Sequence, residues 1–263
     1  MEYLDLLMFV ALMGCILLGF PVSFSIAGVA VAFGYLGWVT DTMNIGLMGA
    51  FGQRVFGTLT NDVLIAIPLF VPMGVVLERS RIAEDLLHTM GRLFGQLRGG
   101  LGISVVLVGA LLAASTGIVG ATVIAMGMIA LPTMLRTGYN PKLASGLVCT
   151  AGTLGQIIPP STLLIILSDV MSSAYQQAQY EQGKFTIETI SVGQIFAGAL
   201  IPGLTLVAIY IIYILLRGYF CPQDMPPVQS DDGRPSMGEV FGAVLPPVLL
   251  IIAVLGAILG GIS

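Results

Sequence analysis

Long apolar segments alternate with short polar ones along the whole chain. Apolar stretches near or above the roughly 18 residues that cross a bilayer as a helix recur, and their Gly, Ala, Leu and Ile content favours helices over the alternating strands of a barrel. The pattern predicts spans over 4–19, 22–38, 62–77 and 193–216, the last interrupted by Pro202, and a final run over 240–262. A short interfacial helix is expected over 45–56. The fold class that follows is all-α and polytopic.

The segment 84–98 has a different pattern from these spans. Its apolar side chains recur at the spacing of one helix face, at Leu86, Leu87, Met90, Leu93, Phe94 and Leu97. Acidic residues stand near its start and Arg92 and Arg98 toward its end, which matches the helix macrodipole. We expect an amphipathic helix that lies on the bilayer surface with its apolar face in lipid.

Basic residues give the chain an orientation. The segment 79–99 holds the densest positive charge, with Arg79, Arg81, Arg92 and Arg98. The positive-inside rule therefore predicts that this segment is cytoplasmic. Three spans precede it, so the N-terminus is expected on the periplasmic side.

The stretch 101–135 is apolar throughout and is bounded by Arg98 and Arg136. Two complete crossings need about 40 residues plus a turn, which is more than this stretch offers. Basic residues at both ends indicate that it enters and leaves on the cytoplasmic side. A re-entrant helical hairpin with small residues at its tip fits both observations. Two short full spans give the same topology, so both interpretations stay open.

The strongest local signal interrupts the apolar run 143–171. Two glycines, Gly152 and Gly155, precede the adjacent pair Pro159 and Pro160. Lipid tolerates unpaired backbone only where it is buried in protein or lines a cavity, so this broken helix is a candidate site. The prolines cannot donate to the carbonyls of Gly155 and Gln156, and we expect those oxygens to be free.

The broken helix and the hairpin tip carry the same chemistry. Both offer neutral oxygen atoms, from backbone carbonyls and from hydroxyls such as those of Thr153, Ser161 and Ser115. Na⁺ is bound by such oxygens in transporters with discontinuous helices. The half-helix that begins near Pro160 would direct its positive end toward an anion. Small residues with Ser or Thr also serve helix packing, and for the tip that alternative remains open.

Composition and motifs exclude several classes of function. With 56% hydrophobic and 9% charged residues and a mean hydropathy of +0.98, the chain is not a soluble globular domain. It has no phosphate-binding loop, no dinucleotide fingerprint and no intramembrane-protease motif, so we expect no enzyme. The polar stretch 172–192 is expected to be an outer loop, and the proline-rich stretch 217–239 a loop between blocks.

Several motifs together resemble one transporter family. They are Ile67-Pro68-Leu69-Phe70-Val71-Pro72-Met73-Gly74, the hairpin with Ser115-Thr116-Gly117, Leu131-Pro132-Thr133-Met134-Leu135-Arg136, and Ala151-Gly152-Thr153-Leu154-Gly155-Gln156-Ile157-Ile158-Pro159-Pro160-Ser161. In this order they resemble the large membrane subunit of tripartite ATP-independent periplasmic (TRAP) transporters. The resemblance runs through most of the chain.

The resemblance implies sodium-driven import of an organic anion, with a carboxylate as the expected substrate class. It implies Na⁺ ligands at Ser115, Thr116, Gly117, Gly152, Thr153, Gly155 and Pro159, and substrate contacts at Thr122, Gln156, Pro160, Ser161 and Thr162. It also implies a bacterial inner-membrane location, a small membrane subunit and a periplasmic substrate-binding protein as partners, and no role for nucleic acid.

The family's elevator-type fold implies a division of the chain. Scaffold spans over 1–78 and the amphipathic helix 79–99 would precede a transport block made of the hairpin 100–136 and the discontinuous helix 137–172. An outer loop and returning span, a cytoplasmic linker and the start of a second half would follow, over 173–217, 218–238 and 239–263. Only one of two expected inverted repeats is recognisable. A receptor-independent dicarboxylate or citrate-type transporter and a non-transporting scaffold subunit are the alternatives.

Overall fold

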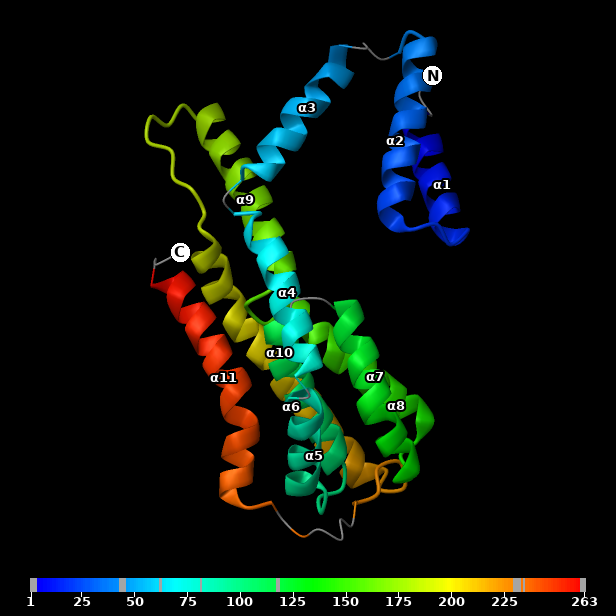
Figure 1. The fold of residues 1–263 in the computed structure, drawn as a ribbon, viewed down its shortest axis with the longest axis vertical. Coiled ribbons are helices and arrows are strands. Elements are labelled where there is room, and N and C mark those ends of the chain that lie inside the picture. Colours follow the sequence, from blue (N-terminus) through cyan, green and yellow to red (C-terminus); the bar gives the residue numbers. More distant parts are fainter. Residues whose placement is uncertain are drawn as a thin grey trace. The chain divides into compact units, whose positions relative to one another are not determined.

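A computed structural model describes residues 4–42, 46–61, 63–80, 82–116, 119–228, 233 and 235–260. Over these residues every regular element is a helix, which confirms the predicted all-α class. The chain divides into two compact units, residues 1–61 and residues 62–263. Figure 1 shows the helices of each unit.

The first unit contains α1 (Leu4–Leu17), α2 (Val22–Val39) and α3 (Gly46–Leu59). Helices α1 and α2 pack against each other, and most of their large apolar side chains are exposed, as expected for helices surrounded by lipid. Helix α3 confirms the short helix expected over 45–56, although Ile45 itself lies outside the described residues.

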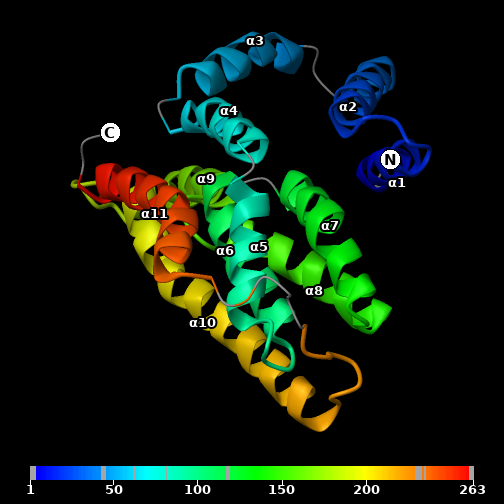
Figure 2. The same cartoon turned by 60° about the horizontal axis from the view of Figure 1, so that its bottom comes forward.

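The second unit is built around α6. Its helices are α4 (Ala66–Arg79), α5 (Ile82–Phe94), α6 (Gly100–Thr116), α7 (Val119–Arg136), α8 (Pro141–Thr153), α9 (Thr162–Glu181), α10 (Val192–Phe220) and α11 (Met237–Leu259). Helix α6 packs against α4, α5, α7, α8, α10 and α11, and its Val105, Val106 and Val108 are fully buried. Figure 2 shows this central position.

Among the described residues, three helices are long and apolar enough to cross a membrane, namely α2, α10 and α11. Four shorter apolar helices accompany them, over Leu4–Leu17, Ala66–Val76, Gly100–Leu112 and Thr122–Arg136. The predicted third span begins later than expected, because α4 starts at Ala66 and Asp62 lies outside the described residues. Pro68 therefore falls in the first turn of α4, where a missing N–H costs no helical hydrogen bond, and only Pro72 is interior.

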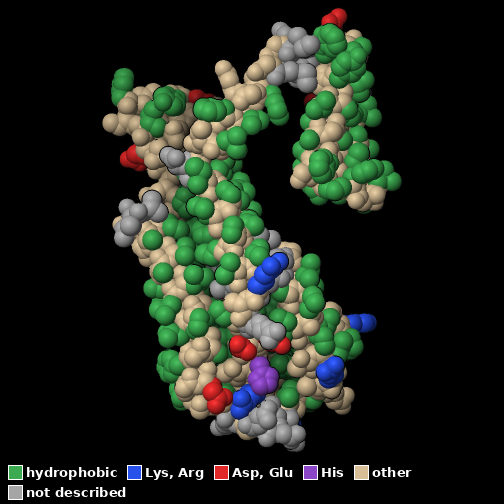
Figure 3. Space-filling model, in the orientation of Figure 1, with side chains coloured by type: hydrophobic (Ala, Val, Ile, Leu, Met, Phe, Trp, Pro, Cys, Tyr) green, Lys and Arg blue, Asp and Glu red, His purple; other side chains and the backbone are tan. Residues whose placement is uncertain are grey.

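Helix α5 has the predicted apolar stripe, and its Leu86, Leu87 and Met90 are buried in protein, whereas Leu97 beyond the helix end is exposed. Leu86 is fully buried, α5 packs against α6 and α11, and the Ser104 hydroxyl of α6 donates to the Met90 carbonyl over 2.7 Å. The expectation that this face lies in lipid is therefore wrong. Figure 3 shows that the basic side chains visible on one face of the second unit lie in its lower half, which includes α5.

Two polar segments predicted as loops are partly helical. Helix α9 continues to Glu181, so the outer connection covers only 182–191 instead of 172–192. The reason is that Gln, Ala and Glu are good helix formers, and the polarity of this segment reflects its exposure. Helix α10 continues to Phe220, so the first residues of the predicted loop 217–239 are helical. Helix α10 also runs without interruption through Pro202, because membrane helices tolerate proline where neighbouring groups satisfy the backbone.

The connection between α10 and α11 is held to the α7–α8 turn by Asp224. Its carboxylate accepts hydrogen bonds from Arg217 over 2.8 Å and from the Asn140 amide side chain over 3.0 Å. Its carbonyl accepts the Asn140 backbone N–H over 3.0 Å. Asn140 is also the N-cap of α8, so Asp224 joins the end of α10 to the start of α8.

Replacing Asp224 with alanine is expected to lower stability by about 1–2 kcal/mol, because two donors lose one acceptor group. Both side chains of the Arg217 pair are partly exposed, so solvent screening limits its share. Thermal unfolding of the detergent-purified protein measures the change. The exposed Asp85 of α5 provides the control, since Asp85→Asn should change stability by less than about 0.5 kcal/mol. Equal effects of the two changes would contradict this role.

In the same turn, Tyr139 is buried against the start of α6. Its hydroxyl oxygen accepts the Gly102 backbone N–H over 3.4 Å. Burial raises the pKa of the Tyr139 hydroxyl, partly offset by the backbone hydrogen bonds from Gly102 and Leu101. The phenol is therefore neutral at physiological pH and contributes to packing at this end.

Candidate functional site

The predicted helix interruption is present. Helix α8 ends at Thr153, a single 3₁₀ turn covers Leu154–Gln156, and α9 begins at Thr162. The intervening Pro159 and Pro160 are joined by a cis peptide bond and are both buried. Because the two prolines are buried in protein, the irregular backbone there meets the condition under which a membrane helix can be discontinuous.

Ser161 holds the two sides of the break together. It is fully buried, and its hydroxyl donates to the Gln156 carbonyl over 2.9 Å. The same oxygen caps α9 by accepting the Leu164 N–H over 3.4 Å. The expectation that the Gln156 carbonyl is unpaired is therefore wrong, because a side chain supplies the donor that proline lacks.

The threonine hydroxyls at the end of α8 donate hydrogen bonds to carbonyl groups of the same helix. Thr153 donates to the Thr150 carbonyl over 2.8 Å, and Thr150 donates to the Gly146 carbonyl over 2.9 Å. Such a hydroxyl keeps both lone pairs available. Thr153 is exposed, so its oxygen can serve as a cation ligand without breaking a helical contact.

The hairpin helices pack closely against the end of α8. A Cβ added to Gly152 would overlap the Cγ2 of Val123 in α7 and would lie 3.0 Å from the Val123 Cα. A Cβ added to Gly109 of α6 would lie 2.7 Å from the Cβ of Ala151. The absence of a side chain at Gly152 therefore lets the backbone of α7 approach α8 closely. Both helices of the hairpin therefore hold the break.

The structure describes only some of the predicted site residues. Buried Thr122 directly precedes Val123, at the contact between α7 and the break. Gly155 is buried in the 3₁₀ turn, Gln156 is half-buried at the end of that turn, and Thr162 is half-buried at the start of α9. The side chains of Ser115 and Thr116, and Gly117 as a whole, lie outside the described residues.

The contact between α10 and the break indicates how deep in the membrane the break lies. A Cβ on Gly203 would lie 3.1 Å from Ile158 Cγ1 and 3.5 Å from the Ile157 carbonyl oxygen. The 29 residues of α10 extend about 44 Å at about 1.5 Å per residue, and Gly203 lies about 16 Å from the start at Val192. The break thus faces the middle part of a helix long enough to cross a hydrocarbon core of about 30 Å.

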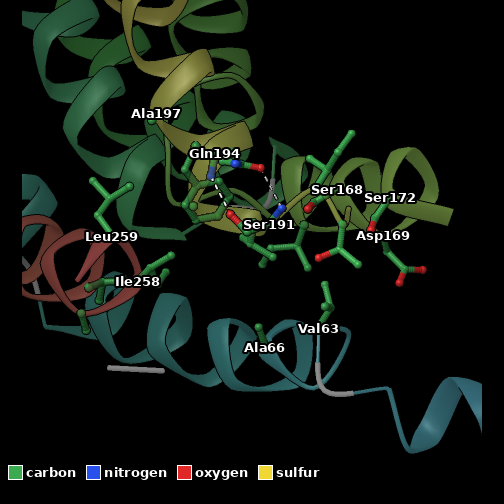
Figure 4. Close-up of a pocket in the computed structure, with 18 of the residues that line it drawn as sticks. Val63, Ala66, Ser168, Asp169, Ser172, Ser191, Gln194, Ala197, Ile258 and Leu259 are labelled. Carbon is green, nitrogen blue, oxygen red and sulfur yellow. Dashed lines mark hydrogen bonds between the residues drawn. The ribbon is translucent and has the colours of Figure 1, made fainter. Parts of the chain in front are cut away.

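A separate cavity of about 1270 Å³ lies beyond the break along α9. Figure 4 shows its walls, which come from α4, α9, α10 and α11, with Ser168 and Asp169 on α9 and Gln194 on α10. Among the predicted site residues that the structure describes, none lines this cavity. Sequence reasoning missed this cavity because it depends on four helices that are distant in the chain; the polar pair at 168–169 inside an apolar run was the only local sign.

A discontinuous helix enclosed by a helical hairpin, inside a set of apolar helices, defines a polytopic α-helical membrane protein of the kind that includes secondary transporters. Residues 9–263 match the family described as "Tripartite ATP-independent periplasmic transporter, DctM component". The chain belongs to this family.

Three relatives show the range of the family. A C4-dicarboxylate TRAP transporter large permease protein of Vibrio cholerae is 29% identical and covers 97% of this chain and 51% of the relative. An ectoine TRAP transporter large permease protein of Halomonas elongata is 26% identical, with 97% and 54% covered. A sialic acid TRAP transporter large permease protein of Vibrio cholerae is 27% identical, with 91% and 51% covered. The chain spans about half the length of these curated relatives, and all three are named as permeases rather than enzymes.

Proposed function

We propose that this chain is part of the large membrane subunit of a TRAP transporter that imports an organic anion together with Na⁺. The observation that carries the proposal is the helix break enclosed by both helices of the hairpin, at Gly109 and Gly152. A break of this kind places backbone and hydroxyl oxygens at membrane depth, where a dehydrated monovalent cation needs them.

The Na⁺ ligands would come from two sides of this contact. Gly152, Thr153, Gly155 and Pro159 supply carbonyl and hydroxyl oxygens on the broken helix. The hairpin tip would add Ser115, Thr116 and Gly117. The free lone pairs of the Thr153 hydroxyl support this assignment, because its proton is already donated within α8.

The anion would bind next to the cation, at the start of α9. This helix directs its positive end toward the break, and its 20 residues make it long enough for a full terminal dipole. Gln156, Pro160, Ser161, Thr162 and Thr122 would form this wall of the pocket. The named substrates of the relatives, C4-dicarboxylate, ectoine and sialic acid, leave the solute of this chain to be determined.

Helix lengths support the re-entrant interpretation of the hairpin. Helix α6 begins beside Ile214 of α10, where a Cβ on Gly99 would lie 2.9 Å from Ile214 Cγ2. From there its 17 residues extend about 26 Å, whereas α10 continues about 33 Å to Val192. The hairpin would therefore turn back before it reaches the outer end of α10.

The same scheme assigns the partners and the orientation. The segment 79–99 would face the cytoplasm of a bacterium and the N-terminus the periplasm, with the protein in the inner membrane. A small membrane subunit and a periplasmic substrate-binding protein would complete the transporter.

Replacing Thr153 with valine tests the sodium site. The change keeps the side-chain shape and removes one oxygen, so we expect near-normal folding and an apparent Na⁺ affinity lower by about tenfold, or about 1.4 kcal/mol. The midpoint of Na⁺-dependent stabilisation against thermal unfolding, with K⁺ or choline replacing Na⁺ at constant ionic strength, measures this affinity.

Thr205→Val is the matched control, because Thr205 of α10 also donates to its own helix over 2.8 Å and is exposed. Its Na⁺ midpoint should equal that of the unmodified protein. Equal midpoints for both variants would place Na⁺ elsewhere. No response to Na⁺ in any of the three proteins, together with uptake by the complete transporter that is unchanged in K⁺, would contradict Na⁺-coupled transport.

A further inference from the structure

The cavity between α4, α9, α10 and α11 has a composition unlike that of an anion site. Among the described residues that line it, Asp169 is the only charged one. An organic anion would meet a negative charge there and no Lys or Arg to pair with it. The cavity therefore suits a ligand whose charged part is cationic or zwitterionic.

The lining is polar on one side and apolar on the other. The polar groups come from α9, with Ser168, Asp169, Ser172, Ser173 and Gln176, and from the connection to α10 and the first turn of that helix. Helices α4 and α11 contribute apolar groups only, such as Leu69, Phe70, Val254 and Ile258. Figure 4 shows Ser168, Asp169 and Ser172 on one side, facing Val63 and Ala66 of the α4 side across the cavity. An amphiphile matches this division.

The polar part of the cavity lies at the depth of lipid head groups. If the break is near the bilayer midplane, as α10 indicates, α9 rises from Ser161 at about 1.5 Å per residue. Ile165 is then about 6 Å from the midplane, Asp169 about 12 Å and Gln176 about 22 Å. The hydrocarbon core ends about 15 Å from the midplane. Asp169 and the polar side chains after it therefore lie at the boundary and in the head-group region.

An apolar layer closes the cavity on the side of the break. Ile165 and Phe196 line the cavity and are each about 1% exposed. Both pack with Leu164, which follows the Ser161 cap by three residues. Because this layer separates the cavity from the break, the occupant of the cavity is distinct from the proposed anion and sodium sites.

We propose that this cavity binds a phospholipid of the outer leaflet with an ammonium-bearing, zwitterionic head group. Asp169 pairs with the ammonium group, and the hydroxyls and amide of Ser172, Ser173 and Gln176 donate to the phosphate. The acyl chains lie against α4 and α11. The volume of about 1270 Å³ exceeds the roughly 300–1,000 Å³ of small-solute pockets and accommodates such a molecule.

Two variants test the site in the purified protein. Ala197→Phe fills the cavity from α10, and Asp169→Asn removes the single charge while keeping the shape. The readout is phosphatidylethanolamine and phosphatidylglycerol retained after extensive detergent washing, measured by mass spectrometry, and the thermal stabilisation that each lipid restores. Ala208→Phe is the control, since Ala208 is exposed on the same helix and does not line the cavity.

We expect the unmodified protein and Ala208→Phe to retain phosphatidylethanolamine and Ala197→Phe to lose most of it. Asp169→Asn should reduce the preference for phosphatidylethanolamine over phosphatidylglycerol by about tenfold, as for one hydrogen bond to a charged group. Three results would overturn the proposal: no retained phospholipid, equal retention in Ala197→Phe and Ala208→Phe, or a preference for phosphatidylglycerol that does not depend on Asp169. None of them depends on Na⁺, so the proposed transport function is tested separately.

Discussion

Replacing Gly152 with alanine is expected to destabilise the protein by about 1–3 kcal/mol, the usual range for overpacking a filled interior. The added methyl group would lie 3.0 and 3.1 Å from the Cα and N of Val123, in addition to its short contact with the Val123 side chain. Backbone atoms of α7 cannot move aside without displacing the hairpin. The midpoint of thermal unfolding in detergent should therefore fall.

Gly146→Ala in the same helix provides the control. Nothing lies within 4 Å of a Cβ on Gly146, so alanine there should raise stability by about 0.5–1 kcal/mol through its higher helix propensity. Stability changes of opposite sign at these two glycines of one helix would distinguish the effect of close packing from the effect of helix propensity. A stabilising effect of Gly152→Ala would contradict the close contact between the break and the hairpin.

A second pair examines the other side of the hairpin. Gly109→Ala brings two Cβ atoms within 2.7 Å, that of position 109 and that of Ala151. Combining it with Ala151→Gly should recover part of the lost stability, because the methyl–methyl overlap disappears. Recovery would identify the contact between α6 and α8 as the source of the loss.

Replacing Ser161 with alanine should lower stability by about 2–4 kcal/mol, because two roles are lost together. The cap of α9 is worth about 1 kcal/mol, and the carbonyl of half-buried Gln156 loses the donor that lay 2.9 Å away, which costs about 1–3 kcal/mol. Thermal unfolding and chemical denaturation in detergent both measure the change. Transport by the complete complex should also fall, since the two halves of the broken helix would no longer be held in register.

Ser236→Ala separates these two roles. Ser236 caps α11 by accepting the Glu239 N–H over 3.3 Å, but it is exposed and its hydroxyl donates only to the exposed Glu239 carboxylate, over 3.1 Å. Its removal should cost about 1 kcal/mol, the value of a cap alone. If both serines cost the same, the bond from Ser161 to Gln156 contributes nothing to the break.

The broken helix shows which features of this protein the local sequence predicts and which it does not. Gly152, Gly155, Pro159 and Pro160 predict an interruption, and the structure places one there. The sequence does not indicate that Ser161 would supply the donor for Gln156, because this bond depends on how the chain turns through the two prolines. The free carbonyl expected at Gln156 is therefore occupied, while the lone pairs of Thr153 remain available.

The amphipathic helix α5 illustrates a second limit. The apolar spacing of Leu86, Leu87 and Met90 predicts one buried face correctly. An apolar face gains free energy from any apolar surroundings, so the pattern cannot distinguish lipid from a neighbouring helix. In the folded protein, α5 packs against α6 and α11.

The sequence by itself determined the elements whose causes are local. Apolar length and content predict the membrane helices, glycine and proline predict the break, and residues 101–135 predict two helices with a turn between them. The tertiary structure alone decided which surfaces meet: the contact of Gly152 with Val123, the covering of α5, the course of α10 through Pro202 and the cavity beside Asp169. The physical reason is that helix propensity and transfer from water act residue by residue along the chain, whereas close packing depends on the shapes of segments that the chain brings together from far apart.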